Sequence, residues 1–233
     1  NENGFVMSNS VYANSKKQTI DAVPLTIENI GKTAEEAKAN PVTIHVERIA
    51  AKVGERSASM LWMGTFHSVF SKILRREAHL LGFTPQFTIY DQSDSRSLVK
   101  SIIKEMGLDE KIYKPNVVAE RISGAKSALV SPRDYENDGG LRGDDVRARI
   151  PSTYEIYKRY DERCRLANAM DFDDLLVKTV ELFKLCPEVL EYYQDRFVYI
   201  MVDEYQDTNS AQFELIRLLA NKNRNLCVVG DDD

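Results

Sequence analysis

The sequence has no apolar run near the roughly 20 residues that are needed to span a bilayer. Its first ten residues have neither the basic start nor the apolar core of a signal peptide. The three cysteines are odd in number and widely spaced, which suggests neither a disulfide framework nor a zinc site. No internal repeat is visible. We therefore expect a cytoplasmic protein that has no membrane segment and whose cysteines are reduced structural thiols.

What the sequence does contain is enough apolar residues for a real core, and an uneven distribution of charge. The chain has 233 residues, of which 43% are apolar, so it can hold one large domain or two small ones. Residues 69–168 carry 18 Lys and Arg against 15 Asp and Glu, a net charge of +3, whereas residues 171–233 carry 6 against 14, a net charge of −8. Such asymmetry suggests two parts with different partners.

The last third of the chain has the pattern of a strand, a helix and a second strand. The apolar, β-branched run 198–202 is typical of a strand buried in a parallel sheet. A helix follows over 208–220, where Asn209 and Gln212 have capping-box spacing, and a second apolar run occupies 226–229. Because crossovers between parallel strands are right-handed, the carboxyl ends of both strands should meet at one edge of the sheet.

Acidic residues follow both of these strands. Asp203 and Glu204 come directly after the first strand, and Asp231 follows the second, so we expect the three to face one crevice. A carboxylate at the end of a buried strand is costly unless a cation or hydrogen-bond donors satisfy it, and Mg²⁺ suits this position. Asp203 is then the metal ligand, while Glu204 orients or deprotonates water. The alternative is a solvated acidic turn, which is common after strands.

The middle of the chain is predominantly helical. A short strand over 60–63 leads into a helix that Gly82 ends, and Asp171 is placed to cap a further helix. Between them, helical periodicity predicts an inserted helical region with three main segments, 94–106, 116–129 and 153–167. The glycine- and proline-containing stretch 131–151 is predicted to be a mobile surface loop. Pro187 separates the helix after Asp171 from a short one that ends near Phe197.

Four short motifs occur along the chain. They are Gly64-Thr65-Phe66-His67-Ser68, Asp171-Phe172-Asp173-Asp174-Leu175, Val202-Asp203-Glu204-Tyr205-Gln206-Asp207-Thr208-Asn209 and Val229-Gly230-Asp231. In order and spacing they resemble the UvrD/Rep/PcrA family of superfamily 1 DNA helicases over roughly residues 46 to 233. The resemblance implies an α/β fold, namely an incomplete RecA-like (P-loop NTPase) parallel sheet with an inserted, mostly α-helical subdomain.

The resemblance also implies a division of the chain. Residues 1–68 would be the N-terminal part of motor domain 1A, with 1–45 atypical. Residues 69–170 would be the helical 1B subdomain, and 171–233 the C-terminal part of domain 1A.

The family's nucleotide chemistry can be carried over to four positions. Asp203 resembles the Mg²⁺-binding aspartate and Glu204 the catalytic glutamate. Gln206 lies where the family couples the nucleotide site to the DNA track, and Asp231, with Gly230, opens the motif that links hydrolysis to strand contact. The resemblance thus implies ATP and Mg²⁺ as cofactors.

A second set of residues is implied to contact DNA. Thr65, Phe66 and His67 match a segment that lines the path of single-stranded DNA, and an aromatic face can stack on bases without regard to sequence. The alternatives are a core phenylalanine at a helix start and a capped surface histidine.

A basic cluster of three residues follows on the same helix, and it suits contact with duplex DNA. It consists of Lys72, Arg75 and Arg76. A solvated helix face is an equal alternative for this cluster.

The phosphate-binding loop departs from its usual pattern. The pattern GxxxxGK[ST] would place Gly31, Lys32 and Thr33 at the phosphates, but Thr26 replaces its first glycine and the β-branched Ile30 precedes Gly31. The triplet is also close to Thr65 for the layout of the family. Alternatively, residues 32–36 resemble part of the family's next motif, a Thr-Asn-Lys-Ala-Ala stretch.

The resemblance implies an ATP-dependent, Mg²⁺-requiring 3′ to 5′ translocase on single-stranded DNA that unwinds duplexes. The chain stops at Asp233, where the family continues into a second motor domain, so we expect a fragment with little or no activity alone. Two alternatives stay open, a non-catalytic DNA-binding or partner-docking module and the motor part of a helicase-nuclease. We expect a monomer whose partners are single-stranded and duplex DNA.

Overall fold

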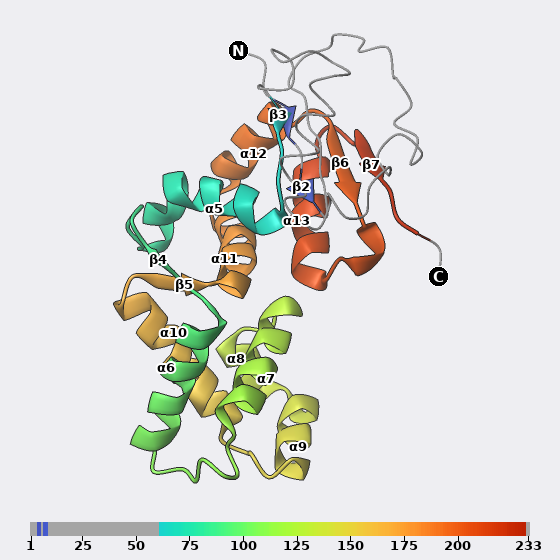
Figure 1. Ribbon diagram of the computed structural model, residues 1–233. Coiled ribbons are helices and arrows are strands. Elements are labelled where there is room, and N and C mark those ends of the chain that lie inside the picture. Colours follow the sequence, from blue (N-terminus) through green and yellow to red (C-terminus); the bar gives the residue numbers. More distant parts are fainter. Residues whose placement is uncertain (1–3, 6, 9–60, 232–233) are drawn as a thin grey trace, which may run out of the picture. The chain divides into compact units, whose positions relative to one another are not determined.

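The computed structural model describes residues 4–5, 7–8 and 61–231, and these residues form two compact units (Figure 1). Within the described residues, the first unit comprises 4–5, 7–8, 61–69, 187–208 and 216–231, and the second comprises 70–186 and 209–215.

The first unit contains a parallel sheet with the strand order β2-β6-β7. The strands are β2 (Met7–Ser8), β6 (Ile200–Asp203) and β7 (Leu226–Val228). Ile200 is the register partner of Leu226, and Val202 that of Val228. The two acid-tipped strands are therefore parallel neighbours, as the strand-helix-strand pattern predicts. A second parallel pair joins β1 (Gly4–Phe5) to β3 (Leu61–Trp62).

An aromatic cluster forms the core beside β3. Helix α12 (Pro187–Arg196) carries Tyr193, whose ring stacks on Phe197 at a centroid distance of 5.7 Å. Trp62 meets Phe197 edge-on at 5.4 Å, and the guanidinium of Arg196 lies 5.2 Å from the centre of the Trp62 ring. The short helix predicted to end near Phe197 is confirmed, and its burial anchors the chain just before β6.

Helix α5 (Phe66–Glu77) follows β3 through a turn that requires glycine. Gly64 has φ 153°, and a Cβ atom there would lie 2.2 Å from Ser68 Oγ. The 3₁₀ helix η1 (Ala78–Leu81) extends α5 and ends at Gly82, which has φ 81°. The predicted stop at Gly82 is confirmed, because its left-handed conformation suits a residue without a side chain.

The second unit is mostly helical and contains a two-stranded parallel ribbon. Its strands are β4 (Thr88–Tyr90) and β5 (Ala169–Asp171), and its helices are α6 (Gln92–Glu105), α7 (Pro115–Ser127), α8 (Pro132–Asn137), α9 (Gly139–Arg147), α10 (Thr153–Leu166) and α11 (Phe172–Leu185). Helix α10 packs against α6, α7 and α8 around one apolar core (Figure 1). The three predicted helices of this region are confirmed as α6, α7 and α10.

The prediction of a mobile loop over 131–151 is wrong. This stretch forms α8 and α9, because Ser131 and Asp138 cap their first turns and Pro132 occupies the first turn of α8, where its missing N–H costs nothing. Tyr135 on α8 is buried and donates a hydrogen bond of 2.9 Å to Asp145 on α9. Burial of these side chains thus outweighs the tendency of glycine and proline to form loops.

Helix α13 (Ser210–Ala220) connects β6 to β7 and begins as predicted. The Asn209 N–H donates to Gln212 Oε1 and the Gln212 N–H donates to Asn209 Oδ1, both at 2.9 Å, which completes the capping box.

The mixture of helices and short parallel strands is compatible with the predicted α/β class. The assignment to a RecA-like sheet with an inserted subdomain stays a prediction, as do the boundaries 1–68, 69–170 and 171–233. No helix in the described part of the chain is long and apolar enough to cross a membrane.

Candidate functional site

The carboxyl ends of β6 and β7 are joined by main-chain hydrogen bonds that extend beyond the strands. The Val229 N–H donates to Val202 O at 2.8 Å, and the Tyr205 N–H donates to Val229 O at 2.9 Å. Asp203, the last residue of β6, is half-buried, and its Oδ1 accepts a hydrogen bond of 3.1 Å from the Glu204 N–H. The residues after both strands are therefore held together at one end of the sheet.

Glu204 adopts a left-handed backbone conformation, with φ 52° and ψ 45°. This conformation costs a residue with a side chain roughly 1 to 2 kcal/mol. It turns the chain out of β6 into the 3₁₀ helix η2 (Tyr205–Asp207). The Gln206 side-chain amide donates a hydrogen bond of 2.7 Å to Glu204 Oε2, which orients the carboxylate.

Gln206 also contacts the chain after β7. Its Oε1 accepts a hydrogen bond of 3.3 Å from the Asp231 N–H. A Cβ atom at position 230 would lie 2.5 Å from this same oxygen, so the close approach depends on Gly230. Gln206 thus links the Glu204 carboxylate to the backbone of the next strand's end. The sequence signal for this contact is the glycine directly after an apolar run.

The structure brings Asp203, Glu204, Gln206 and Asp231 to one end of the sheet. Within the described residues, no group of three or more His, Cys, Asp and Glu side chains is arranged to hold a metal ion by itself. Mg²⁺ commonly takes only one or two carboxylates and completes its shell with water and phosphate oxygens. The single half-buried carboxylate of Asp203 fits that requirement. The candidate phosphate-loop residues Gly31, Lys32 and Thr33 lie outside the described residues.

The predicted DNA-contact residues at the start of α5 differ in their accessibility. Thr65 is exposed and caps the helix, since its Oγ1 accepts a hydrogen bond of 3.2 Å from the Ser68 N–H. Phe66 has only 1% of its surface accessible, which matches the alternative of a core phenylalanine. His67 is half-buried. A base could stack on Phe66 only after a rearrangement, so we leave it out of the interface.

The three residues of the basic cluster on α5 also differ in their exposure. Lys72 and Arg76 are exposed and lie one helical turn apart. Arg75 is instead half-buried: its guanidinium donates to Pro85 O at 2.8 Å and to Phe87 O, and it lies 3.7 Å from the centre of the Phe87 ring. These contacts make Arg75 a structural residue that fixes the chain after η1, which the sequence pattern did not indicate.

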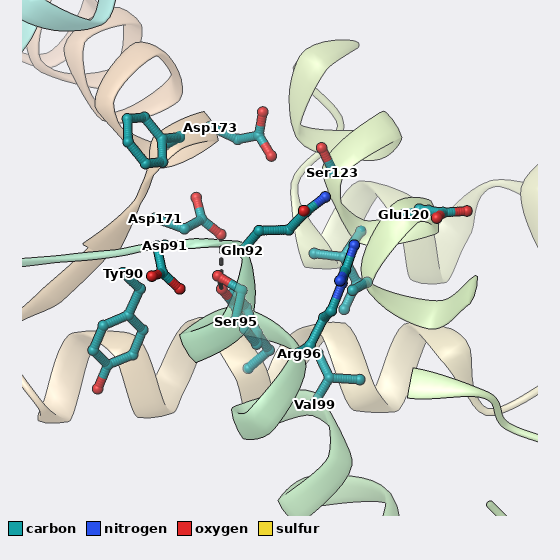
Figure 2. Close-up of a pocket in the computed structure, with 14 residues that line it drawn as sticks. Tyr90, Asp91, Gln92, Ser95, Arg96, Val99, Glu120, Ser123, Asp171 and Asp173 are labelled. Carbon is teal, nitrogen blue, oxygen red and sulfur yellow. Dashed lines mark hydrogen bonds between the residues drawn. The ribbon is translucent and has the colours of Figure 1, made fainter. Parts of the chain in front are cut away.

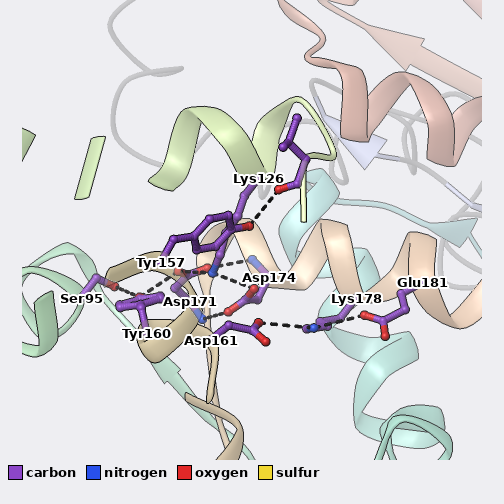
Figure 3. A network of polar contacts seen from close by, with 10 residues as sticks. Ser95, Lys126, Tyr157, Tyr160, Asp161, Asp171, Asp174, Lys178 and Glu181 are labelled. Atoms are coloured by element: carbon purple, nitrogen blue, oxygen red, sulfur yellow. Dashed lines mark hydrogen bonds and ion pairs between the residues drawn. The ribbon is translucent and has the colours of Figure 1, made fainter. Parts of the chain in front are cut away.

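The Asp171 to Leu175 motif forms a buried polar cluster. Asp171 caps α11 as predicted: its Oδ1 accepts from the Asp174 N–H at 2.8 Å, and Asp174 Oδ2 accepts from the Asp171 N–H at 3.1 Å. Lys126 Nζ on α7 lies 2.7 Å from both Asp171 Oδ2 and Asp174 Oδ1 (Figure 3). No sequence signal indicated that a lysine 45 residues earlier in the chain is the partner of this motif.

Burial and charge act in opposite directions on this cluster. Burial raises the pKa of Asp174 to about 6 from its usual 3.8, although Lys126 acts against the change. Burial also disfavours ionised Asp171, but Lys126 and the hydrogen bonds from the Asp174 N–H and the Tyr160 hydroxyl together outweigh it and hold the pKa of Asp171 below 3.8. For Lys126, burial is outweighed by the two carboxylates, so that its pKa lies well above 10.5. Lys126 and Asp171 therefore stay ionised at neutral pH.

A cavity of about 350 Å³ lies beside this cluster (Figure 2). It is lined by the first residues of α6 and α11, by one side of α7 and by Tyr160 of α10. Its charged lining is mostly acidic, with Asp91, Glu120, Asp171 and Asp173 against Arg96. None of the residues predicted for nucleotide or DNA contact lines this cavity.

Comparison with known protein families decides the affiliation of the chain. The family model described as "UvrD/REP helicase N-terminal domain" matches residues 34–233. The chain belongs to this family. The UvrD/REP match begins just after Gly31, Lys32 and Thr33, whereas all four motifs of the sequence lie inside it.

Two curated relatives share 43% identity with the chain. One is the ATP-dependent DNA helicase PcrA of Staphylococcus epidermidis, which aligns over 209 residues, 90% of this chain and 27% of the relative. Another is the ATP-dependent DNA helicase PcrA of Staphylococcus aureus strain Mu50, aligned over 187 residues, 80% of this chain and 25% of the relative. The chain thus spans about a quarter of the length of these relatives.

Proposed function

We propose that the chain is part of the first motor domain of an ATP-dependent DNA helicase that moves 3′ to 5′ on single-stranded DNA and unwinds duplexes. The observation that supports this most is the Gln206 bridge. It ties the Glu204 carboxylate, at the end of β6, to the backbone of Asp231, after the neighbouring strand β7. A change at either strand end would therefore be transmitted to the other.

In this proposal each residue at the strand ends has its own task. Asp203 would hold Mg²⁺, and the bound ion would neutralise developing charge on the phosphates of ATP. The Glu204 carboxylate, oriented by Gln206, would accept a proton from the attacking water. Asp231 would couple the nucleotide site to the chain that follows β7, through its hydrogen bond with Gln206. Charge stabilisation from a second motor domain is needed as well, so the 233-residue chain alone should hydrolyse little or no ATP.

The proposed DNA contacts involve residues at the start of α5 and on its surface, of which Thr65, Lys72 and Arg76 are exposed and His67 is half-buried. Thr65 and His67 would line the path of single-stranded DNA, and Lys72 and Arg76 would contact phosphates. In the variant Lys72→Ala/Arg76→Ala, the slope of log affinity against log salt should fall by about 1 to 2, since each lost phosphate contact removes close to one unit. An unchanged slope would exclude these two residues from the interface.

Calorimetric titration with ATP in the presence and absence of Mg²⁺ tests the nucleotide site. Asp203→Asn removes the charge while it keeps the side-chain shape, and it should abolish Mg²⁺-dependent binding. Asp207→Asn is the matched control, because Asp207 is an exposed acid of the same motif. DNA binding by a chain that binds no nucleotide would instead indicate the alternative, a non-catalytic DNA-binding or docking module.

A further inference from the structure

The helices α6 to α10 are connected to the rest of the second unit through a very small element. The chain enters this α6–α10 segment (residues 91–168) from β4 and leaves it into β5, and these two strands pair with each other over three residues. An isolated two-stranded ribbon is marginally stable and holds few contacts. The ribbon alone would therefore leave the segment free to swing relative to α11.

Buried polar contacts cross from the α6–α10 segment to α11. Lys126, on α7, has 1% of its side chain exposed and pairs with Asp171 and Asp174, the cap and the third residue of α11. Tyr160, on α10, places its hydroxyl 2.8 Å from Asp171 Oδ2 and 3.0 Å from Ser95 Oγ of α6 (Figure 3). Helices α7 and α10 of the segment thus contact the first turn of α11 directly, and α6 joins this network through Tyr160.

The geometry of Lys126 requires one specific arrangement of these elements. Its ammonium group lies 2.7 Å from each carboxylate and 4.9 Å from the centre of the Tyr160 ring, so its positions relative to α10 and α11 are fixed together. If α7 moved away from α11, two buried carboxylates would lose their cation, and breaking a buried pair from one side is costly. Outside this cluster, Lys178 of α11 lies 3.6 Å from Asp161 of α10, in a more exposed pair.

We propose that Lys126 is a positioning residue that fixes the orientation of the α6–α10 segment on α11, across the β4–β5 ribbon. Other residues of α7, such as Val118 and Ile122, pack within the segment's own core, so they stabilise its fold without fixing its orientation. Lys126 instead joins the segment to an element outside it. This role depends on the contacts of the second unit and is independent of nucleotide chemistry.

Hydrogen–deuterium exchange of the 233-residue chain tests the proposal by region. Lys126→Met keeps most of the side-chain volume but removes the charge. It should raise amide exchange at least tenfold in the ribbon and in the first turn of α11, residues 88–90 and 169–174, while the middle of α10 keeps its protection. Val118→Ala is the matched control on the same helix, since Val118 is fully buried in the segment's core. It should raise exchange inside the α6–α10 segment and spare 169–174.

The double variant Lys126→Met/Asp174→Asn separates positioning from the general cost of unpaired buried charge. Asp174→Asn removes one of the two carboxylates that Lys126→Met leaves unpaired, so the melting temperature should recover in part. If Lys126 positions the segment, exchange at 169–174 stays raised despite this recovery. The proposal is overturned if exchange at 169–174 returns to the wild-type rate together with the melting temperature, or if Lys126→Met raises exchange uniformly across the second unit.

Discussion

The left-handed backbone of Glu204 gives a prediction in which glycine and alanine exchange their usual order of stability. At an ordinary helical position, glycine is about 1 kcal/mol less stabilising than alanine. At Glu204, with φ 52°, alanine keeps the steric conflict that glycine lacks, and relief of this conflict amounts to roughly 1 to 2 kcal/mol. After subtraction of the greater freedom of glycine in the unfolded chain, Glu204→Gly should be about 0.5 to 1 kcal/mol more stable than Glu204→Ala.

The comparison uses two variants at the same site, so that the lost hydrogen bond from Gln206 cancels. For a domain of this size, 1 kcal/mol shifts the melting temperature by about 2 to 4 °C, which thermal unfolding by circular dichroism resolves. Glu162, exposed on α10, is the matched control, and there the glycine variant should be the less stable by about 1 kcal/mol. If the glycine variant is the less stable one at position 204 as well, the backbone of Glu204 is not left-handed in solution, and the chain leaves β6 by a different turn.

Three further predictions concern other contacts. Gly230→Ala should displace the Gln206 side chain from the Asp231 N–H. The free energy of unfolding should fall by less than about 1 kcal/mol, because the new methyl group meets only the end of a flexible side chain. Nuclear magnetic resonance should detect the displacement as a changed chemical shift of the Gln206 side-chain amide. The folded pKa of Asp174, about 6, lies above its usual 3.8, so its contribution to stability is present below pH 3.8 and is lost as the pH rises through 6. Asp174→Asn should remove this loss, which amounts to at most about 3 kcal/mol for a difference of about two pH units, and denaturant unfolding between pH 3.5 and 7.5 measures it. Arg75→Met should lower the free energy of unfolding by about 1 to 3 kcal/mol, because the carbonyl oxygens of Pro85 and Phe87 lose their hydrogen-bond donor. An unchanged denaturation midpoint would contradict the structural role of Arg75.

Local signals in the sequence predicted a large part of the fold. Apolar periodicity placed α6, α7 and α10, and the short-range hydrogen bonds of Asn209 and Asp171 formed as their spacing indicated. The neighbouring parallel positions of β6 and β7 followed from connection geometry alone. Such features depend on residues a few positions apart, which is why the pattern is visible in the chain.

The features that the sequence did not show depend on contacts between distant residues. Helices α8 and α9 are fixed by burial of Tyr135 against Asp145, which outweighs the local glycine content. Arg75 reads as one of three similar basic residues, yet it alone meets the carbonyls of the turn after η1. Phe66 matches a DNA-contact motif but is buried. At the strand ends, the sequence indicated which residues meet, whereas the bridge through Gln206 depends on the close approach of two chain segments that are 25 residues apart.

The parallel direction of β4 and β5 restricts how the protein could be shortened. Tyr90 pairs with Asp171, so the end of β4 and the beginning of β5 lie at opposite ends of the ribbon, about 7 Å apart along the strands. A tight turn, which can close an antiparallel hairpin, cannot join strands that run the same way, and such a connection needs about a dozen residues or more. A minimal version of this protein would therefore have to keep a connection of about a dozen residues or more between β4 and β5, and deletion of the whole segment 91–168 should dissolve the ribbon.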